Sequence, residues 1–206
     1  QIGCLFKALT PVGSGRMSEN IGNYIEELRH TTTVAGLNYE VWWIYKGRDS
    51  RLKYLDGINK YSLFFQTSLH AHFVALLVAL YRLYETRTDT YNIPGLIRVL
   101  REQKAFSEEV LEETEKLYKE EAKPLWVKVS ILRNKAFGHR SNAHTMKEIF
   151  EEAGVTPGEL RDLVEVTKKL MNHITHEWDR STHAFNLGSR ESLINLLEDI
   201  KKWHQC

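Results

Sequence analysis

Apolar residues recur every three or four positions along most of the chain, and this spacing limits the possible folds more than any other feature. The pattern begins at Ile21, Tyr24, Ile25 and Leu28 and continues to a stop at Gly47. Such spacing puts side chains on one face of an α-helix, whereas a half-buried strand needs strict alternation. We find no alternating segment of convincing length and no internal repeat. The sequence therefore predicts an all-α protein.

Start signals divide this pattern into separate helices. Asn92-Ile93-Pro94 and Thr156-Pro157 each place a capping residue before a proline in the first helical turn, and acidic residues follow Ser107. Residues 58–85 are apolar on most sides, which favours a position at the centre of a bundle. We expect an up-and-down bundle of five to seven helices, within residues 18–46, 58–85, 92–104, 107–137, 145–153, 156–180 and 189–203, with a kink or break at Pro124.

Length and composition favour a single domain over residues 17–206. The chain has 206 residues, of which 42% are hydrophobic, and this is enough for one sizeable core and marginal for two. Residues 1–16 lack a starting Met and carry no signal-peptide pattern, so we expect a flexible or added leader before Met17.

The cysteines and the longest apolar run bear on the compartment. Cys4 and Cys206 lie at opposite ends and make neither a disulfide framework nor a metal-ligand set, which favours a reducing, cytoplasmic setting. The run from Phe73 to Tyr81 is far shorter than the roughly 20 residues that span a bilayer. We therefore expect no membrane segment, no metal and no cofactor.

Charge is nearly balanced overall, with 28 Lys and Arg against 27 Asp and Glu, but it is uneven along the chain. Residues 108–121 contain seven Glu and two Lys, and residues 123–147 contain six basic residues and no acidic one. The basic stretch could hold an anion such as phosphate, because Arg adds a planar pair of donors to its charge. Alternatively, the acidic and basic stretches pair with each other across the bundle.

Arg133 and His139 lie in the basic stretch, within Arg133-Asn134-Lys135-Ala136-Phe137-Gly138-His139-Arg140. Six residues apart on an ideal helix, they would not share a face. If Gly138 ends the helix in a left-handed cap, however, the chain reverses and the long Arg133 side chain can reach His139. The spacing thus suits a site at a helix end.

This pair suits metal-free cleavage of RNA. The reaction needs a base for the 2′-hydroxyl proton, an acid for the 5′-oxygen and positive donors at the phosphate. His139 could be base or acid, and Arg133 could hold the phosphate. One histidine does not obviously serve as both, and a two-fold dimer would supply a second set of groups.

Residues 133–139 resemble the motif that marks the HEPN superfamily of helical nucleotide- and RNA-binding domains. In that motif an Arg is followed by a polar residue, and a His comes after four to six residues in all. Trp42-Trp43, the apolar helix through Leu69 and Leu83, and Tyr91-Asn92-Ile93-Pro94 are similar to the abortive-infection type U branch of this superfamily. The resemblance covers most of residues 17–204. It implies a dimerising helical bundle and, in active members, a metal-independent endoribonuclease that acts as a toxin or antiphage effector.

The resemblance assigns catalysis to Arg133 and His139 and the polar position to Asn134. We expect the substrate to be contacted by Asn134, Lys135, Arg140 and Lys128. The expected partners are RNA, a second copy of the chain and an antitoxin protein. A non-catalytic HEPN module that binds nucleotide, RNA or a partner is the alternative, and a helical adaptor is a third reading.

Other groups of residues have less specific patterns. His173, His176 and Glu177 share a helix face, but a helix surface or a bundle contact explains them better than a metal site does. A further set of aromatic residues could stack RNA bases, although core packing or a dimer interface is the favoured use: Trp42, Trp43, Tyr45, Tyr61, Phe64 and Phe65.

Overall fold

The computed structural model describes residues 21–135 and 146–203, and every regular element in those ranges is helical. The elements are α1 (Ile21–Lys46), α2 (Arg48–Lys53), α3 (Leu55–Lys60), α4 (Ser62–Tyr84), α5 (Ile93–Glu102), α6 (Glu108–Lys116), the π-helix η1 (Leu117–Ala122), α7 (Lys123–Arg133), α8 (Met146–Ala153), α9 (Pro157–Asp179) and α10 (Ser189–Trp203). The all-α prediction is confirmed. The expected leader at residues 1–16 lies outside the described residues.

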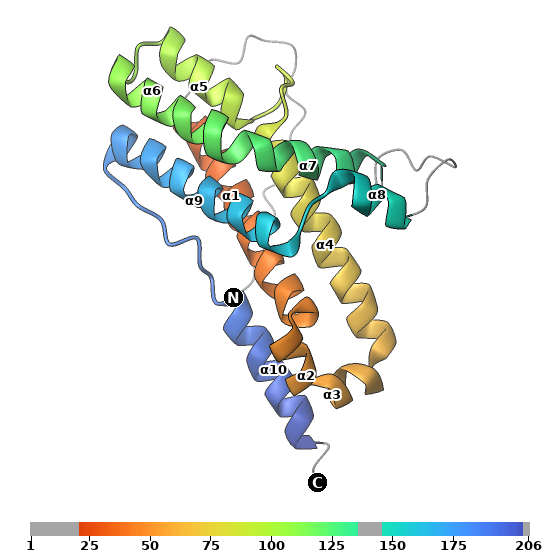
Figure 1. Cartoon of the computed structure of the whole chain (residues 1–206). Coiled ribbons are helices and arrows are strands. Elements are labelled where there is room, and N and C mark those ends of the chain that lie inside the picture. The colour runs from red at the N-terminus through yellow and green to blue at the C-terminus, as the bar shows by residue number, and fades with distance from the viewer. Residues whose placement is uncertain (1–20, 136–145, 204–206) are drawn as a thin grey trace.

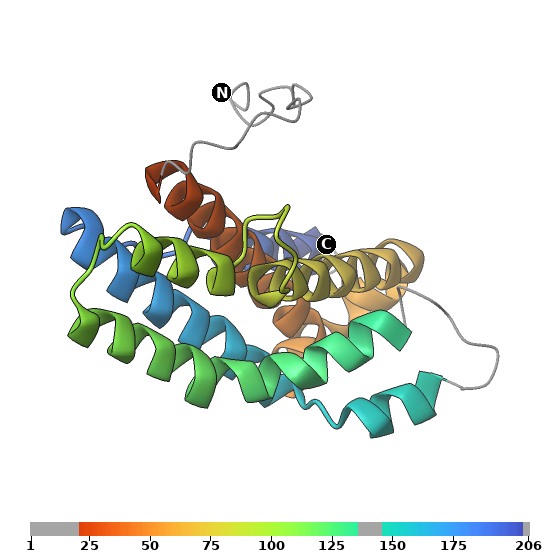
Figure 2. The same ribbon diagram turned by 90° about the horizontal axis from the view of Figure 1, so that it is seen from above.

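Helices α1 and α4 form the antiparallel pair on which the bundle is built (Figure 1). α2 and α3 make the turn between them, and residues 58–60, expected to begin the second long helix, belong to α3. α9 packs against α1 on another side, and α7 crosses α4 (Figure 2). Most buried apolar side chains lie in the core between these four helices and α5.

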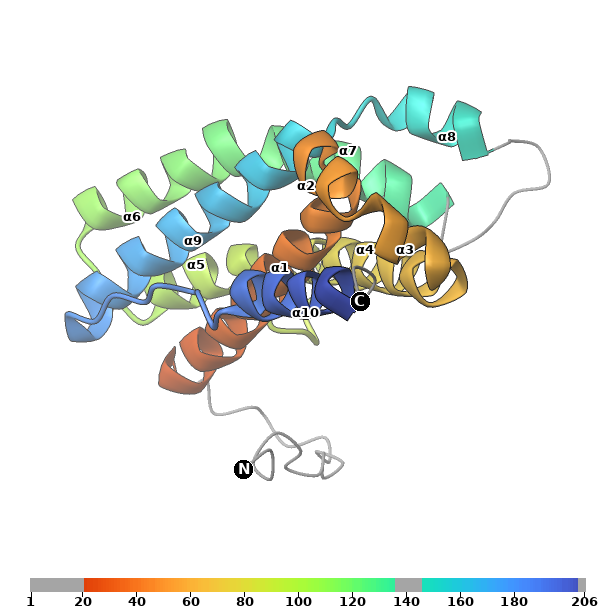
Figure 3. The ribbon, with the colours of Figure 1, turned by 90° about the horizontal axis from the view of Figure 1, so that it is seen from below.

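A smaller core lies at the far end of the α1–α4 pair, where α10 packs along α1 and beside α3 (Figure 3). Its buried members are Ile44, Tyr45, Tyr54, Phe65, Leu193 and Leu197. Burial divides the aromatic set: Trp42, Tyr45 and Phe65 are buried, as the core-packing interpretation predicts. Trp43, Tyr61 and Phe64 remain exposed.

The predicted helix starts are confirmed in atomic detail. The side chain of Asn92 accepts a hydrogen bond from Gly95 N at 2.8 Å, and Ser107 caps α6 in the same way. Thr156 and Glu159 form a reciprocal capping box at the start of α9, with Pro157 in the first turn. Gly95 is also required sterically, because a Cβ there would lie 2.2 Å from the Tyr24 hydroxyl.

The predicted kink or break at Pro124 is instead a change of helix type. α6, η1 and α7 form one uninterrupted helical run (Figure 2). In η1 the amide of Lys123 bonds to the carbonyl of Tyr118, five residues back. The wider π turn accommodates a proline that has no N–H to give and whose ring crowds the preceding turn. Counting this run as one helix, the described ranges hold seven helices of eight residues or more, which are α1, α4, α5, α6–η1–α7, α8, α9 and α10.

Helix α4 is only half in the core, which corrects the expectation of a fully central helix. Its C-terminal half holds the fully buried side chains Leu76, Leu80 and Leu83, whereas Leu63 and Phe64 in its first turn are exposed. By length and composition α4 could span a bilayer, with a mean hydropathy of 1.7 and about 33% of the 18-residue window buried. The apolar run from Phe73 to Tyr81, on which the sequence prediction was based, is shorter than α4, which contains it. One such helix is weak evidence for a membrane, because core helices have the same length and composition.

Candidate functional site

The guanidinium of Arg133 lies at the C-terminal end of α7, over the face of an aromatic ring from α4. Its central carbon is 4.4 Å from the centre of the Tyr81 ring. A cation over an aromatic face is attracted by the negative charge of that face. On α7, Trp126 lies beside the same ring, at 6.3 Å between ring centres. The Tyr81 ring thus supports a half-buried Arg133, and Trp126 packs against Tyr81.

The charge of Arg133 is not neutralised by any carboxylate among residues 21–135 and 146–203. Within the described part of the chain, Nη1 of Arg133 donates a hydrogen bond to Oδ1 of the neighbouring Asn134, at 3.0 Å. Because neither the ring nor the amide carries a formal charge, the guanidinium keeps its full attraction for an anion. Its planar set of donors matches the geometry of a phosphate.

The two predicted lysine contacts face in another direction. Lys128 pairs with Glu159 at the start of α9 and donates to Gly154 O at 3.2 Å. Lys135 pairs with Glu152 of α8. Lys128 and Lys135 are seven residues apart, which is two helical turns, so they share a face that Arg133 does not share. A role for these lysines in substrate binding stays a prediction.

The ion pair at Glu159 also has an electrostatic signature. The ammonium of Lys128 and the Thr156 backbone amide both bond to the Glu159 carboxylate and lower its pKa. The pair therefore joins α7 to the N-terminus of α9 through charged hydrogen bonds. Together with Lys135 and Glu152, it fixes α8 and the start of α9 against α7.

The acidic and basic stretches do not pair with each other within the described part of the chain. Ion pairs of the acidic stretch go to Arg101, Lys119 and Lys169. Those of the basic stretch go to α8 and α9, as described above. Each stretch has its own partners, so mutual pairing does not explain the basic one.

The remaining predicted site residues fall in the segment between α7 and α8. His139 and Arg140 lie outside the described residues, as does the expected cap at Gly138. Asn134 and Lys135 continue α7 in a π-helical turn. The described half of the predicted site is thus Arg133 and Asn134 at the end of α7.

Sequence reasoning did not identify Tyr81 as part of this site. Tyr81 is 52 positions from Arg133 and lies in an apolar helix, where an aromatic residue reads as core. It lacks any local signal for a contact with Arg133. Only the crossing of α7 over α4 brings the two together.

His173, His176 and Glu177 of α9, which the sequence favours as a helix surface or a bundle contact, differ in their exposure and partners. Glu177 pairs with Arg180 at 3.5 Å, and His176 is exposed. The described residues contain no group of three side chains arranged to hold a metal ion.

Comparison with known protein families identifies the family of this chain. Residues 18–203 match the AbiU2 family of HEPN domains. The chain belongs to the AbiU2 HEPN family. The match includes α1 to α10 and the whole segment from Arg133 to His139. No curated protein and no solved structure matches the chain.

Membership of the AbiU2 family agrees with the resemblance identified from the sequence. It relates the chain to abortive infection and to the HEPN fold.

Proposed function

We propose that this AbiU2 protein is a metal-independent endoribonuclease that acts as a toxin or antiphage effector. The observation that carries the proposal is the half-buried Arg133 at the end of α7, which has no carboxylate partner among the described residues and lies six positions before His139. Family membership over residues 18–203 supports reading these two residues as the HEPN motif.

In the proposed reaction, the 2′-hydroxyl of a ribose attacks the adjacent phosphorus. The hydroxyl proton goes to a base, the bond to the 5′-oxygen breaks, and an acid protonates that leaving oxygen. The products are a 2′,3′-cyclic phosphate and a 5′-hydroxyl. Arg133 binds the phosphate and stabilises the charge that develops on its oxygens. His139 is the base or the acid, and a second copy of the chain in a two-fold dimer supplies the complementary group.

Incubation of the purified protein with single-stranded RNA in EDTA tests the proposal. We expect cleavage to persist in the chelator and to leave cyclic-phosphate ends. A matched strand with 2′-deoxyriboses should resist cleavage, because it lacks the nucleophile. RNA binding without cutting would instead identify the non-catalytic alternative, and neither binding nor cutting would leave a helical adaptor.

Tyr81 should act as a positioning residue for Arg133 in this reaction. We expect Tyr81→Leu to lower the cleavage rate constant about three- to tenfold, because the guanidinium loses the ring that orients it. The change should fall on kcat more than on KM. Tyr81→Phe keeps the ring and should restore the rate, and thermal melting should show both variants folded. Equal losses in the Leu and Phe variants would contradict the positioning role.

A further inference from the structure

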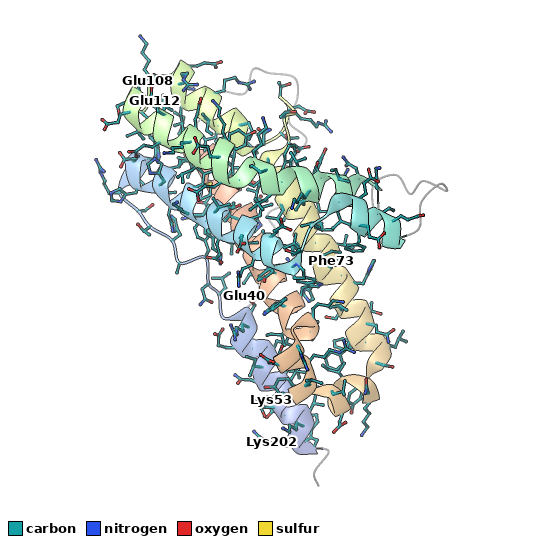
Figure 4. All side chains as sticks on the ribbon, in the orientation of Figure 1. Glu40, Lys53, Phe73, Glu108, Glu112 and Lys202 are labelled. Atoms are coloured by element: carbon teal, nitrogen blue, oxygen red, sulfur yellow. The ribbon has the colours of Figure 1, made fainter. Side chains whose placement is uncertain are left out.

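A cavity of about 440 Å³ lies between α1, α4 and the link from α8 to α9. Trp42, Phe73 and Phe150 line it, and Figure 4 labels Phe73 on α4 near that link. The three rings are stacked, with 5.3 Å between the centres of Trp42 and Phe73 and 6.1 Å between those of Phe73 and Phe150. The angles between successive ring planes are 23° and 20°. The cavity therefore offers an ordered aromatic wall to a planar ligand.

Phe150 is the solvent-facing end of this stack. Trp42 and Phe73 are buried, whereas Phe150 is 38% exposed. A planar group that enters the cavity can add to the stack without displacing a core side chain. The volume falls within the range of about 300–1,000 Å³ that is typical of small-molecule sites.

The polar groups at this cavity favour an anionic ligand that has hydrogen-bonding edges. Lys46, Gln66 and His70 are exposed side chains in its lining, and none of the described residues in that lining is a carboxylate. Lys46 makes no ion pair with any described residue, so its charge is available to a phosphate. The Gln66 amide can donate and accept hydrogen bonds at the edge of a base.

A second cavity of similar size shows the contrast. It lies where the end of α1 meets α2 and α10, and it has a volume of about 450 Å³. Arg48 and Arg190 line it, but so do Glu40 and Asp49, and Figure 4 labels Glu40 on α1 there. Mixed charge makes that cavity the poorer site for an anion.

Helix α4 joins the aromatic cavity to the Arg133 site. His70 and Tyr81 are eleven residues apart, close to three full turns, so they project from the same side of α4. Phe73 and Tyr81 are separated by about 12 Å along the helix axis. A single strand with one phosphate at Arg133 can therefore follow α4 and place a nearby base at the cavity.

We propose that this cavity binds one base of the RNA, stacked on Phe150, with Lys46 on the phosphate of the same nucleotide. The inference rests on the proposed function, because it assigns the base to a strand held at Arg133. It adds a base-recognition subsite to the phosphate contact.

The test uses a short oligoribonucleotide with 2′-O-methyl riboses, which cannot be cleaved, and a series in which one base at a time is removed. For the wild-type protein, we expect one abasic position to weaken binding about tenfold. Phe150→Leu should weaken binding of the intact strand by a similar factor, and removal of that base should then have no further effect. Phe150→Tyr should bind as wild type, and Trp203→Leu, on an exposed side chain of α10, is the matched control.

A second variant avoids any effect on the stacked rings. Lys46→Ala changes an exposed residue and should lower the slope of log affinity against log salt by about 0.7, the value for one phosphate contact on a single strand. Undiminished binding by Phe150→Leu, or an abasic penalty that survives in that variant, overturns the inference.

Cleavage of the unmodified strand separates the two proposals. If the wild type cleaves the strand, but the Phe150→Leu substitution and removal of the base weaken binding independently, only the base subsite is overturned. If the two changes have coupled effects on binding but the unmodified strand is not cleaved, only the proposed nuclease activity is overturned.

Discussion

Replacing Arg133 with alanine should lower RNA cleavage about 100- to 1,000-fold. The guanidinium at the end of α7 has no carboxylate partner in residues 21–135 and 146–203, and loss of one preorganised donor to a developing oxyanion typically costs this much in kcat. The effect should appear in single-turnover rate constants measured at saturating protein. Folding should be unchanged, because Arg133 makes no ion pair with any described residue.

Two further variants test whether the loss of cleavage is specific to the guanidinium of Arg133. Arg133→Lys keeps the charge but loses the planar pair of donors, so it should recover only part of the rate. Arg98→Ala removes an exposed arginine from α5 and should cleave at the wild-type rate. If Arg133→Ala cleaves as fast as Arg98→Ala, Arg133 has no role in the reaction.

Replacing His139 with alanine should lower cleavage about 100- to 10,000-fold, the usual contribution of a general acid or base. Free imidazole added to this variant should restore part of the rate, because it can transfer the same proton. Because histidine is the side chain whose charge ordinarily changes near neutral pH, the wild-type rate should depend on pH in that range. The same dependence should be absent from the variant.

The control for His139 is a histidine that lies outside the predicted site. His176 is exposed on α9, and His176→Ala should leave the rate and its pH dependence unchanged. A wild-type rate in His139→Ala would mean that proton transfer does not use this histidine and would remove the HEPN mechanism.

The helical fold could be predicted because its signals are local. The caps at Asn92, Ser107 and Thr156 each act over three residues, so the donor and the acceptor lie close together in the sequence. The family also follows from local motifs, and the match over residues 18–203 confirms it. Periodicity does not specify which helices meet.

The structure of the site depended on those helix contacts. Nothing near Arg133 in the sequence indicates Tyr81, and nothing near Lys128 indicates Glu159, because each contact is made across the bundle. The central position expected for α4 was wrong in its first turns for a related reason. An apolar composition shows that a helix can be buried, but the packing of its neighbours decides how much of it is.

The π turn at η1 sets the direction in which the reactive end of α7 points. Residues 108–133 form one rod, so α7 inherits its rotation from the turns before it. One residue fewer in η1 would rotate everything beyond it by about 100°, away from the ring of Tyr81 and from both paired glutamates. The direction of the Arg133 side chain is thus set by helical turns in η1, more than ten residues before it.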